Sequence, residues 1–358
     1  MFIKFSMKKF SNKKVIIAMS GGVDSAVAAV LLKEQGYQVE GVFMRLGIAG
    51  DNESEKNARV VANKMGIKFH ALDLSKEFKK KVINYFISEY KKGRTPNPCV
   101  MCNRKIKFGI LLDKILKMDA DCIATGHYVK ELRIKNQESR TIKLLKAKDK
   151  NKDQSYFLYN LNQKKLKRCL FPLGNYTKDE VMEIAKKYKL KSQNQKESQE
   201  ICFIQDKYYG DFLQKHLKLR SGDIVDVNNN ILGSHKGLPL YTIGQRRDIR
   251  IGGTGPYYVI GMNKRKNQLV VNNDKNNKNL FSKKLTAKKV NWISKNVPKF
   301  PFKVMAKTRY RMNEQPATIN RIKNKYVITF SKSQRAIMPG QSVVFYKGDE
   351  ILGGGVIA

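Results

Sequence analysis

Residues 18–25 read AMSGGVDS and connect an apolar run, KVIIAM, to a segment with the spacing of a helix. Gly21 and Gly22 would let the backbone approach a phosphate closely, and the hydroxyls of Ser20 and Ser25 could donate hydrogen bonds to it. No lysine follows the glycines, whereas a Walker-type loop ends in Gly-Lys-Ser or Gly-Lys-Thr. The pattern predicts a nucleotide loop without that lysine. A tight turn that binds nothing is the alternative.

Two segments carry cysteines that could act as nucleophiles. The first, GRTPNPCVMCNRKIKFG at 93–109, places Cys99 and Cys102 in a C-x-x-C, and its prolines favour an extended approach to a helix. We expect Cys102 near the N-terminus of that helix with basic residues beside it, which favours the thiolate. The second segment is KESQEICFIQD at 196–206, where Cys202 follows a polar loop.

The C-x-x-C has other interpretations, as half of a zinc site or as a redox pair. A zinc site needs two more ligands, and the four histidines and remaining cysteines show no second spacing typical of metal sites. Cys122 and Cys169 lie among apolar residues, which predicts inert core thiols. The odd total of five cysteines argues against a secreted disulfide scaffold and for reduced thiols in a cytosol.

The surrounding pattern indicates an α/β fold. Short apolar runs alternate with helical patterns from residue 14 to about 130, which predicts a doubly wound domain with a parallel sheet. The first helix has one apolar stripe and Gly36 as a natural terminator. A capping-box pattern opens another helix at Thr177. The α/β portion therefore extends to about residue 205.

The rest of the chain has short alternating strands with Gly, Asn and Pro turns, typical of small β-barrel-like units. We therefore expect three domains: a nucleotide-binding catalytic domain at 1–205, a small β-rich domain at 206–282 and a β-barrel at 283–358.

The charge is strongly positive, with 71 Lys and Arg against 30 Asp and Glu and a formal net charge of +41. Such a field attracts a polyanion such as nucleic acid. Coding bias is the other explanation, because lysine and asparagine fill even turns such as NNDKNNKN. No apolar run is long enough to span a bilayer, and the basic first residues lack the apolar core of a secretory signal. We expect a cytoplasmic protein.

Motifs along nearly the whole chain resemble those of one enzyme family. The SGGVDS loop resembles the PP-loop of the ATP pyrophosphatase superfamily. Together with the cysteine segments, KDQSYFL, FPLG, YTIGQRR, TRYR, PGQSVVFY and GGGVI, it is similar to the tRNA-specific 2-thiouridylases, the MnmA or TrmU type. The resemblance implies an N-terminal PP-loop domain followed by two mostly β domains.

The resemblance also implies a chemistry. Such enzymes use ATP with Mg²⁺ to adenylate the C2 oxygen of the wobble uridine in tRNA, which makes that oxygen a better leaving group. Cys202 would carry the incoming sulfur as a persulfide, and Cys102 would resolve it and leave a disulfide that an external reductant resets. The implied partners are tRNAs for Lys, Glu and Gln, and a cysteine desulfurase or sulfur-relay protein. The target base must leave its stack to react.

The matching positions carry further implied roles, one by one. ATP contacts are implied for Ala18, Met19, Ser20, Gly21, Gly22, Val23, Asp24, Ser25, Met44 and Gly126. Contacts with the target base are implied for Asn97, Pro98 and Cys99. Contacts with tRNA are implied for His127, Lys152, Asp153, Gln154, Arg309, Tyr310 and Gln341. Asp24 is also the side chain expected to help to hold Mg²⁺.

Two positions depart from the family pattern. Many members have Asp in place of Cys99, so a proposed proton-transfer role must fall elsewhere, and Cys99 becomes a rival of Cys102 as the resolving thiol. Asn57 stands where relatives commonly have Asp. The alternatives are another PP-loop adenylating enzyme, such as a lysidine synthetase or an amidotransferase-linked synthetase, and a non-catalytic tRNA-binding protein. Dependence on both Cys102 and Cys202 would separate the leading hypothesis from these.

Overall fold

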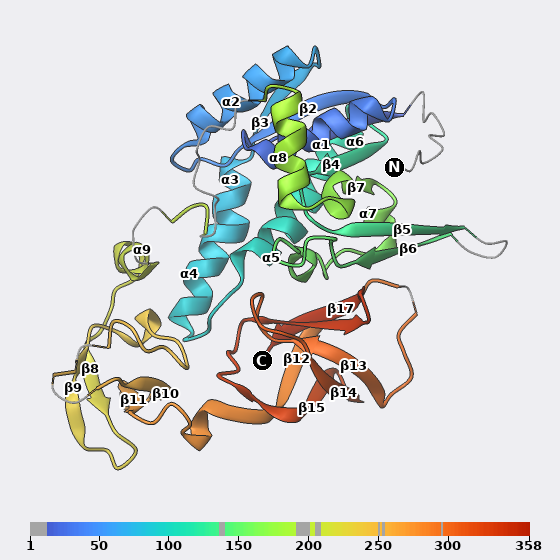
Figure 1. Cartoon of the computed structure of the whole chain (residues 1–358). Helices are drawn as coiled ribbons and strands as arrows, with labels where there is room; N and C mark the ends of the chain where they lie inside the picture. The colour runs from blue at the N-terminus through green and yellow to red at the C-terminus, as the bar shows by residue number, and fades with distance from the viewer. Residues whose placement is uncertain are drawn as a thin grey trace.

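The computed structural model describes residues 13–135, 140–190, 201–204, 209–249, 251–252, 255–294 and 296–358. Its N-terminal part contains a five-stranded sheet in the order β3-β2-β1-β4-β7, and every pairing in it is parallel (Figure 1). The strands are β1 Lys14–Ala18, β2 Gln38–Arg45, β3 Phe69–Asp73, β4 Cys122–Thr125 and β7 Cys169–Leu170.

Helices cover both faces of this sheet, as the alternation of its side chains requires. Val15 and Ile17 of β1 pack into one buried cluster and Ile16 into another. The first cluster contains residues of α1 Val23–Glu34, α2 Asp51–Lys64 and α8 Lys178–Lys187. The second contains residues of α3 Ser75–Phe78, α4 Asn84–Lys91, α5 Pro98–Cys102 and α6 Leu112–Leu116, with the π-helical segments η1 Lys79–Ile83 and η2 Asn103–Leu111. The predicted doubly wound arrangement is confirmed.

Short elements complete this part: α7 Gln163–Leu166, and the 3-10 helices η3 Ser155–Phe157 and η4 Pro172–Asn175. The predicted helix signals are confirmed where α1 and α8 begin or end. Gly36 has a positive φ of 84° just beyond α1. At α8, the Thr177 hydroxyl accepts from the Glu180 backbone N at 3.3 Å, and the Glu180 carboxylate accepts from the Thr177 backbone N at 2.6 Å.

A second, four-stranded sheet follows in the order β10-β11-β8-β9. Its strands are β8 Gly222–Val225, β9 Ile231–His235, β10 Tyr258–Asn263 and β11 Gln268–Asn272, and α9 Tyr209–His216 and the 3-10 helix η5 Leu238–Leu240 belong to the same region. In Figure 1 this sheet lies to the lower left, below α9.

The C-terminal part is a closed six-stranded barrel, because β12 pairs with both β15 and β17. Its strands are β12 Phe281–Trp292, β13 Phe302–Lys307, β14 Gln315–Ile322, β15 Lys325–Arg335, β16 Ser342–Lys347 and β17 Glu350–Ile357, preceded by the 3-10 helix η6 Lys278–Leu280. A third buried cluster fills it. The hairpin of β5 Lys130–Lys135 and β6 Arg140–Leu145 extends this sheet through β17, with Glu350 opposite Leu145.

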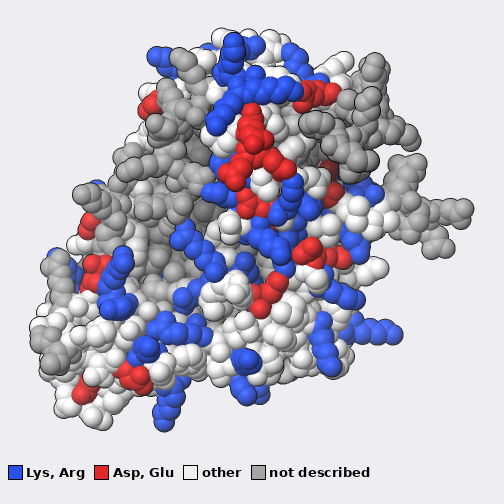
Figure 2. All heavy atoms as spheres, viewed as in Figure 1, with Lys and Arg blue, Asp and Glu red and all other residues white. Residues whose placement is uncertain are grey.

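The surface carries its positive charge broadly. Figure 2 shows Lys and Arg scattered over this face from top to bottom, not gathered in one stripe, with a group of Asp and Glu among them in the upper centre. Among the described residues, no helix has the length and apolar character needed to cross a membrane.

Candidate active site

The nucleotide loop lies where the strand order of the parallel sheet reverses. From β1 the chain moves outward to β2 and β3, and it then returns to place β4 on the other side of β1. Ligands of open α/β sheets bind at this switch point, beyond the carboxyl ends of the strands. The loop follows β1 directly, and Gly126 follows β4. A Cβ added to Gly126 would lie 3.0 Å from the backbone N of Ser25, so these two segments touch.

The loop is built from backbone groups and hydroxyls. Gly21 has a φ of 80°, and a Cβ there would lie 2.4 Å from the carbonyl oxygen of Ser54, so only glycine fits. The Ser25 hydroxyl accepts from the Ser20 backbone N at 3.1 Å and donates to the Gly22 carbonyl at 3.0 Å. Helix α1 begins after Gly22 without a side-chain cap, which leaves its positive end suited to a phosphate.

The other residues predicted for ATP lie around this loop. Ala18 ends β1, Val23 opens α1, and Met44 is half-buried on the adjacent strand β2. Met19 is buried and its backbone N donates to Val42 at 2.8 Å, so its side chain faces the core. The structure therefore brings the predicted ATP residues to one edge of the sheet. Their contacts with ATP remain a prediction.

Asp24 has two partners that the sequence did not indicate. Its Oδ1 accepts from the Tyr128 hydroxyl at 2.8 Å and lies 2.6 Å from the Lys178 ammonium. Tyr128 follows β4, and Lys178 is the first residue of α8. No local spacing could have found Lys178, because only the packing of α8 on α1 places it here. Among the described residues, no group of three His, Cys, Asp or Glu side chains could hold a metal.

The thiols of Cys99, Cys102 and Cys202 lie close enough to influence one another. Asn97 caps α5, accepting from the Val100 backbone N at 3.1 Å, and Pro98 is the first helical residue. Cys99 lies in the first turn of α5, and Cys102 is the last residue of α5, directly before η2. Besides burial, the charges of Cys99 and Cys202 raise the pKa of Cys102. The two segments predicted to hold the nucleophiles therefore meet.

The predicted thiolate character is wrong for this state of the protein. Burial raises the pKa of Cys102 to about 12 and that of Cys202 to about 11, and it also raises that of Cys99. Loss of hydration outweighs the charge of Lys107, which lowers the pKa of all three thiols. Cys99 and Cys202 still expose part of their surface, and both are free thiols. Reagents can therefore reach thiols that are mainly protonated.

An aromatic cluster holds the Cys202 segment. The Phe203 ring lies 5.3 Å from Phe86, 5.5 Å from Phe212 and 5.9 Å from Phe78, measured between centroids. Phe203 is 8% exposed, whereas its neighbour Cys202 is exposed. The segment therefore leaves part of Cys202 accessible, while the Phe203 side chain anchors it. Cys122 and Cys169 are buried, as predicted for core thiols.

The thiols lie on the same side of the molecule as the nucleotide loop. The charge of Asp51, the first residue of α2, reaches Cys202, and Ser54 one turn later touches Gly21. On the other side, the Lys107 charge lowers the pKa of His127, although burial is the larger cause. Helix α2 therefore carries one residue that touches the nucleotide loop and another whose charge acts on Cys202.

Several residues predicted to contact tRNA have internal partners. His127 is 7% exposed, and its Nδ1 lies 2.8 Å from the Thr125 hydroxyl. Burial holds its pKa well below the ordinary value, so the ring is neutral. Asp153 is 9% exposed and accepts from the Ala147 backbone N at 3.0 Å and the Ser155 hydroxyl at 2.7 Å. Both side chains are buried as they lie here, and their contacts with tRNA stay predictions.

The neighbours of Asp153 are more accessible. Gln154 accepts from the Tyr128 backbone N at 3.0 Å, and the half-buried Lys152 donates its backbone N to Asp149 at 3.2 Å. The structure also brings this segment to the barrel, because the rings of Phe157 and Tyr310 lie 4.5 Å apart. Their contacts with tRNA stay predictions.

Two further predicted tRNA residues also bond within the protein. The Arg309 guanidinium donates to the carbonyl of Ala336. The Gln341 amide donates to the carbonyls of Thr95 at 3.1 Å and Pro96 at 3.3 Å. Because Pro96 immediately precedes Asn97, Gln341 ties the barrel to the segment predicted to meet the target base.

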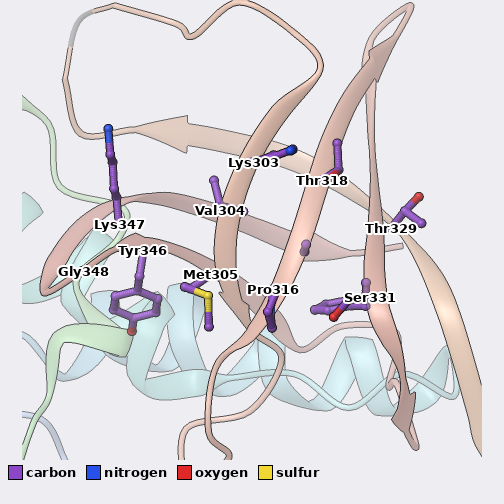
Figure 3. A pocket seen from close by; sticks show the side chains of 12 residues that line it. Lys303, Val304, Met305, Pro316, Thr318, Thr329, Ser331, Tyr346, Lys347 and Gly348 are labelled. Carbon is purple, nitrogen blue, oxygen red and sulfur yellow. The ribbon is translucent and has the colours of Figure 1, made fainter.

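A hollow of about 580 Å³ lies elsewhere, on the outside of the barrel. Figure 3 shows Met305, Pro316, Ser331 and Tyr346 around it, with Lys303 and Lys347 at its edge. It contains none of the residues predicted for chemistry, so it does not mark the active site.

Three family models match successive parts of the chain. The tRNA methyl transferase HUP domain matches residues 13–206, the tRNA methyl transferase PRC-barrel domain 210–273 and the aminomethyltransferase β-barrel domain 282–357. One solved structure, a 4-thiouridine synthetase–RNA complex with bound ATP, has a TM-score of 0.34 and 20% identity. It covers 50% of this chain and 41% of that chain, too weak a likeness to carry an argument.

Curated relatives match over almost the full length. The tRNA-specific 2-thiouridylase MnmA of Clostridioides difficile (strain 630) is 47% identical over 363 residues, covering 97% of this chain and 99% of that protein. The protein of the same name from Carboxydothermus hydrogenoformans is 43% identical over 366 residues, covering 98% and 99%. The chain belongs to the tRNA-specific 2-thiouridylase MnmA family.

Proposed function

We propose that this chain uses ATP to replace the C2 oxygen of the wobble uridine in tRNA by sulfur. The observation that carries the proposal is that Cys102 and Cys202 lie near enough for the charge of Cys202 to raise the pKa of Cys102. A thiol pair is what sulfur delivery requires, whereas the other adenylating enzymes considered above need no such pair. The free thiols fit a reducing cytoplasm.

The first step activates the base. The loop backbone and the positive end of α1 bind the pyrophosphate part of ATP, so the α-phosphorus stays open to the C2 oxygen of uridine. Bond formation between them releases pyrophosphate and leaves an adenylated base. Mg²⁺ that enters with ATP would neutralise phosphate charge, and the second carboxylate oxygen of Asp24 suits it, because Mg²⁺ commonly combines one carboxylate with phosphate oxygens.

The second step delivers sulfur. A cysteine desulfurase or relay protein charges Cys202 with a persulfide, whose terminal sulfur attacks C2, directly or as released hydrosulfide, and AMP leaves. Cys102 attacks the inner sulfur, so the persulfide S–S bond breaks and a Cys102–Cys202 disulfide forms. An external dithiol supplies two electrons to restore both thiols. Cys99 lies in the same cluster, where many relatives have a carboxylate, and it is a rival of Cys102 for this role.

Recognition of tRNA uses the other domains. The broad positive face would hold the phosphate backbone, and the segment from Asn97 to Cys99 would contact the extruded base (Figure 2). Gln154, Arg309 and Tyr310 border the junction between the α/β domain and the barrel, where the anticodon arm would lie. The substrates we expect are tRNAs for Lys, Glu and Gln.

Mass spectrometry of tRNA nucleosides tests the proposal. We expect ATP-dependent 2-thiouridine from tRNA, Mg²⁺-ATP and a persulfide donor, with at least a hundredfold loss in Cys202→Ser and Cys102→Ser. Cys99→Ser should remain active. Cys122→Ser, which changes a buried thiol outside the cluster, is the control. Tight tRNA binding without thiolation under any sulfur supply would overturn the proposal in favour of another adenylation reaction or a binding protein.

A further inference from the structure

The nucleotide loop lacks a cation in its own sequence, but the fold brings one to it. Residues 18–26 contain no lysine or arginine. The Lys178 ammonium lies 2.6 Å from Asp24 Oδ1, and its side chain is 18% exposed. A Walker-type lysine follows its glycines directly in the chain. Here a lysine from a distant helix reaches the corresponding place.

The base of Lys178 is firmly positioned. Its backbone N donates to the Asp149 carboxylate at 2.9 Å, and the capping box of Thr177 and Glu180 fixes the turn that it begins. Val181, one turn later, packs into the same buried cluster as α1. The backbone of Lys178 is therefore held in place, and its side chain extends toward the loop. A small movement of the ammonium group is enough to exchange Asp24 for a phosphate.

The pairing with Asp24 is not explained by stability alone. A partly buried ion pair gives up hydration on both sides, and its net contribution to folding is commonly small. Asp24 also accepts from Tyr128 at 2.8 Å, so the carboxylate has a second donor when the lysine leaves. A triphosphate offers an ammonium several anionic oxygens in place of one carboxylate. The lysine is therefore held ready beside the phosphate site.

We propose that Lys178 binds the pyrophosphate part of ATP and supplies the cation that the loop lacks, with Asp24 as its partner while the loop is empty. This assignment rests on the ATP-using function proposed above. It gives the leaving pyrophosphate a positive partner without placing a lysine in the loop. Asp24 is then freed to face Mg²⁺ when the nucleotide enters.

Binding of two nucleotides separates this role from a structural one. The probes are the non-hydrolysable ATP analogue AMPCPP with Mg²⁺, and AMP, which lacks the β- and γ-phosphates. We expect Lys178→Gln to weaken AMPCPP binding roughly tenfold or more, as loss of a charged hydrogen bond does, and to leave AMP binding unchanged. Lys178→Arg should retain part of the affinity. Titration calorimetry measures both nucleotides without tRNA or sulfur.

Lys148→Gln is the matched control, because Lys148 pairs with Glu180 of the same helix at 2.5 Å and does not contact the loop. It should change neither affinity. Equal weakening of AMPCPP and AMP in Lys178→Gln, or no weakening of either, would overturn the assignment while the ATP site stands. If the unchanged protein bound neither nucleotide, both the ATP site and this assignment would fail. If the unchanged protein formed no 2-thiouridine, yet Lys178→Gln weakened AMPCPP binding and left AMP binding unchanged, the proposed reaction would fail and the role of Lys178 would stand.

Discussion

At the scale of residues, Lys107 is the cation whose charge reaches each thiol of the cluster. It lies five positions after Cys102 in the π-helical segment η2, whose i→i+5 hydrogen bonds bring residues at this spacing together. Its charge lowers the pKa of Cys99, Cys102 and Cys202, although burial raises each of them more. The thiols are therefore protonated at neutral pH, and deprotonation grows as the pH rises toward 11 at Cys202.

Alkylation rates test this balance. Iodoacetamide reacts with the thiolate, so the Cys202 rate should rise about tenfold per pH unit from 7 to 10, whereas a free cysteine levels off near its pKa of about 8.5. Lys107→Gln should slow alkylation roughly three- to tenfold at a fixed pH, because the pKa rises further. Lys105→Gln is the control, since Lys105 is not among the groups that shift the pKa of these thiols. A plateau below pH 9 would contradict the effect of burial.

The sequence predicted the nucleotide loop and the thiol pair because their chemistry lies in short, local patterns. It could not predict which polar side chains the fold would bury. Asp153 stands in a polar stretch and His127 follows an apolar strand, and local spacing showed neither the Thr125 hydroxyl beside His127 nor the Ser155 hydroxyl that donates to Asp153. The Lys178 contact was missed for the same reason, since it depends on the packing of two helices.

At the scale of elements, the Cys202 segment depends on one anchor. Phe203 inserts between the rings of Phe78, Phe86 and Phe212, which come from three helices: α3, α4 and α9. Edge-on ring contacts of this kind add to the free energy gained by burying the ring. The position of the Cys202 thiol therefore depends on helices that precede and follow it in the chain.

Phe203→Ala should uncouple the thiol from the active site. Loss of a buried phenyl ring costs about 3 kcal/mol where the surroundings cannot collapse, so the segment should lose its fixed position. We expect at least tenfold slower 2-thiouridine formation with unchanged AMPCPP affinity, and an intermediate rate in Phe203→Leu. Phe302→Ala is the control: it removes a ring that lies 6.3 Å from the Trp292 ring in the barrel, and it should leave the rate near that of the unchanged protein. An unchanged rate in Phe203→Ala would show that the anchor is dispensable.

The pattern of elements was predicted in outline, with one limit. The alternation of apolar runs with helical patterns in the first domain was sufficient to predict a doubly wound sheet. The β5–β6 hairpin could not be assigned, because Ile142 and Leu144 alternate with Thr141 and Lys143 as in any edge strand. Its partner strand β17 lies at the far end of the chain. Pairing between distant strands leaves no local sequence signal.

At the scale of the molecule, the segment before the target-base loop joins all three parts of the chain. The Thr95 backbone N donates to Pro339 at 2.8 Å, and its hydroxyl lies 3.1 Å from that of Thr242 in the central region. Gly340 packs tightly on Thr95, because a Cβ added to Gly340 would lie 3.0 Å from the carbonyl oxygen of Thr95. With the Gln341 amide, these contacts form a clasp, here defined as Thr95, Thr242 and residues 339–341.

Gln341→Leu tests whether the clasp positions the loop or Gln341 binds tRNA itself. The substitution keeps the size of the side chain and removes the donor that holds the Thr95 and Pro96 carbonyls. If the clasp positions the loop, kcat should fall roughly tenfold, as loss of one or two hydrogen bonds predicts, while the Kd for tRNA changes less than about twofold. Thr242→Val should give a smaller fall in kcat, and the fall in the double variant should be less than the sum of the two, because both residues act on Thr95.

Weaker tRNA binding with an unchanged kcat would instead assign Gln341 to the RNA interface. Faster hydrogen exchange at Thr95 in Gln341→Leu without tRNA separates the two, since only a positioning role changes the empty protein.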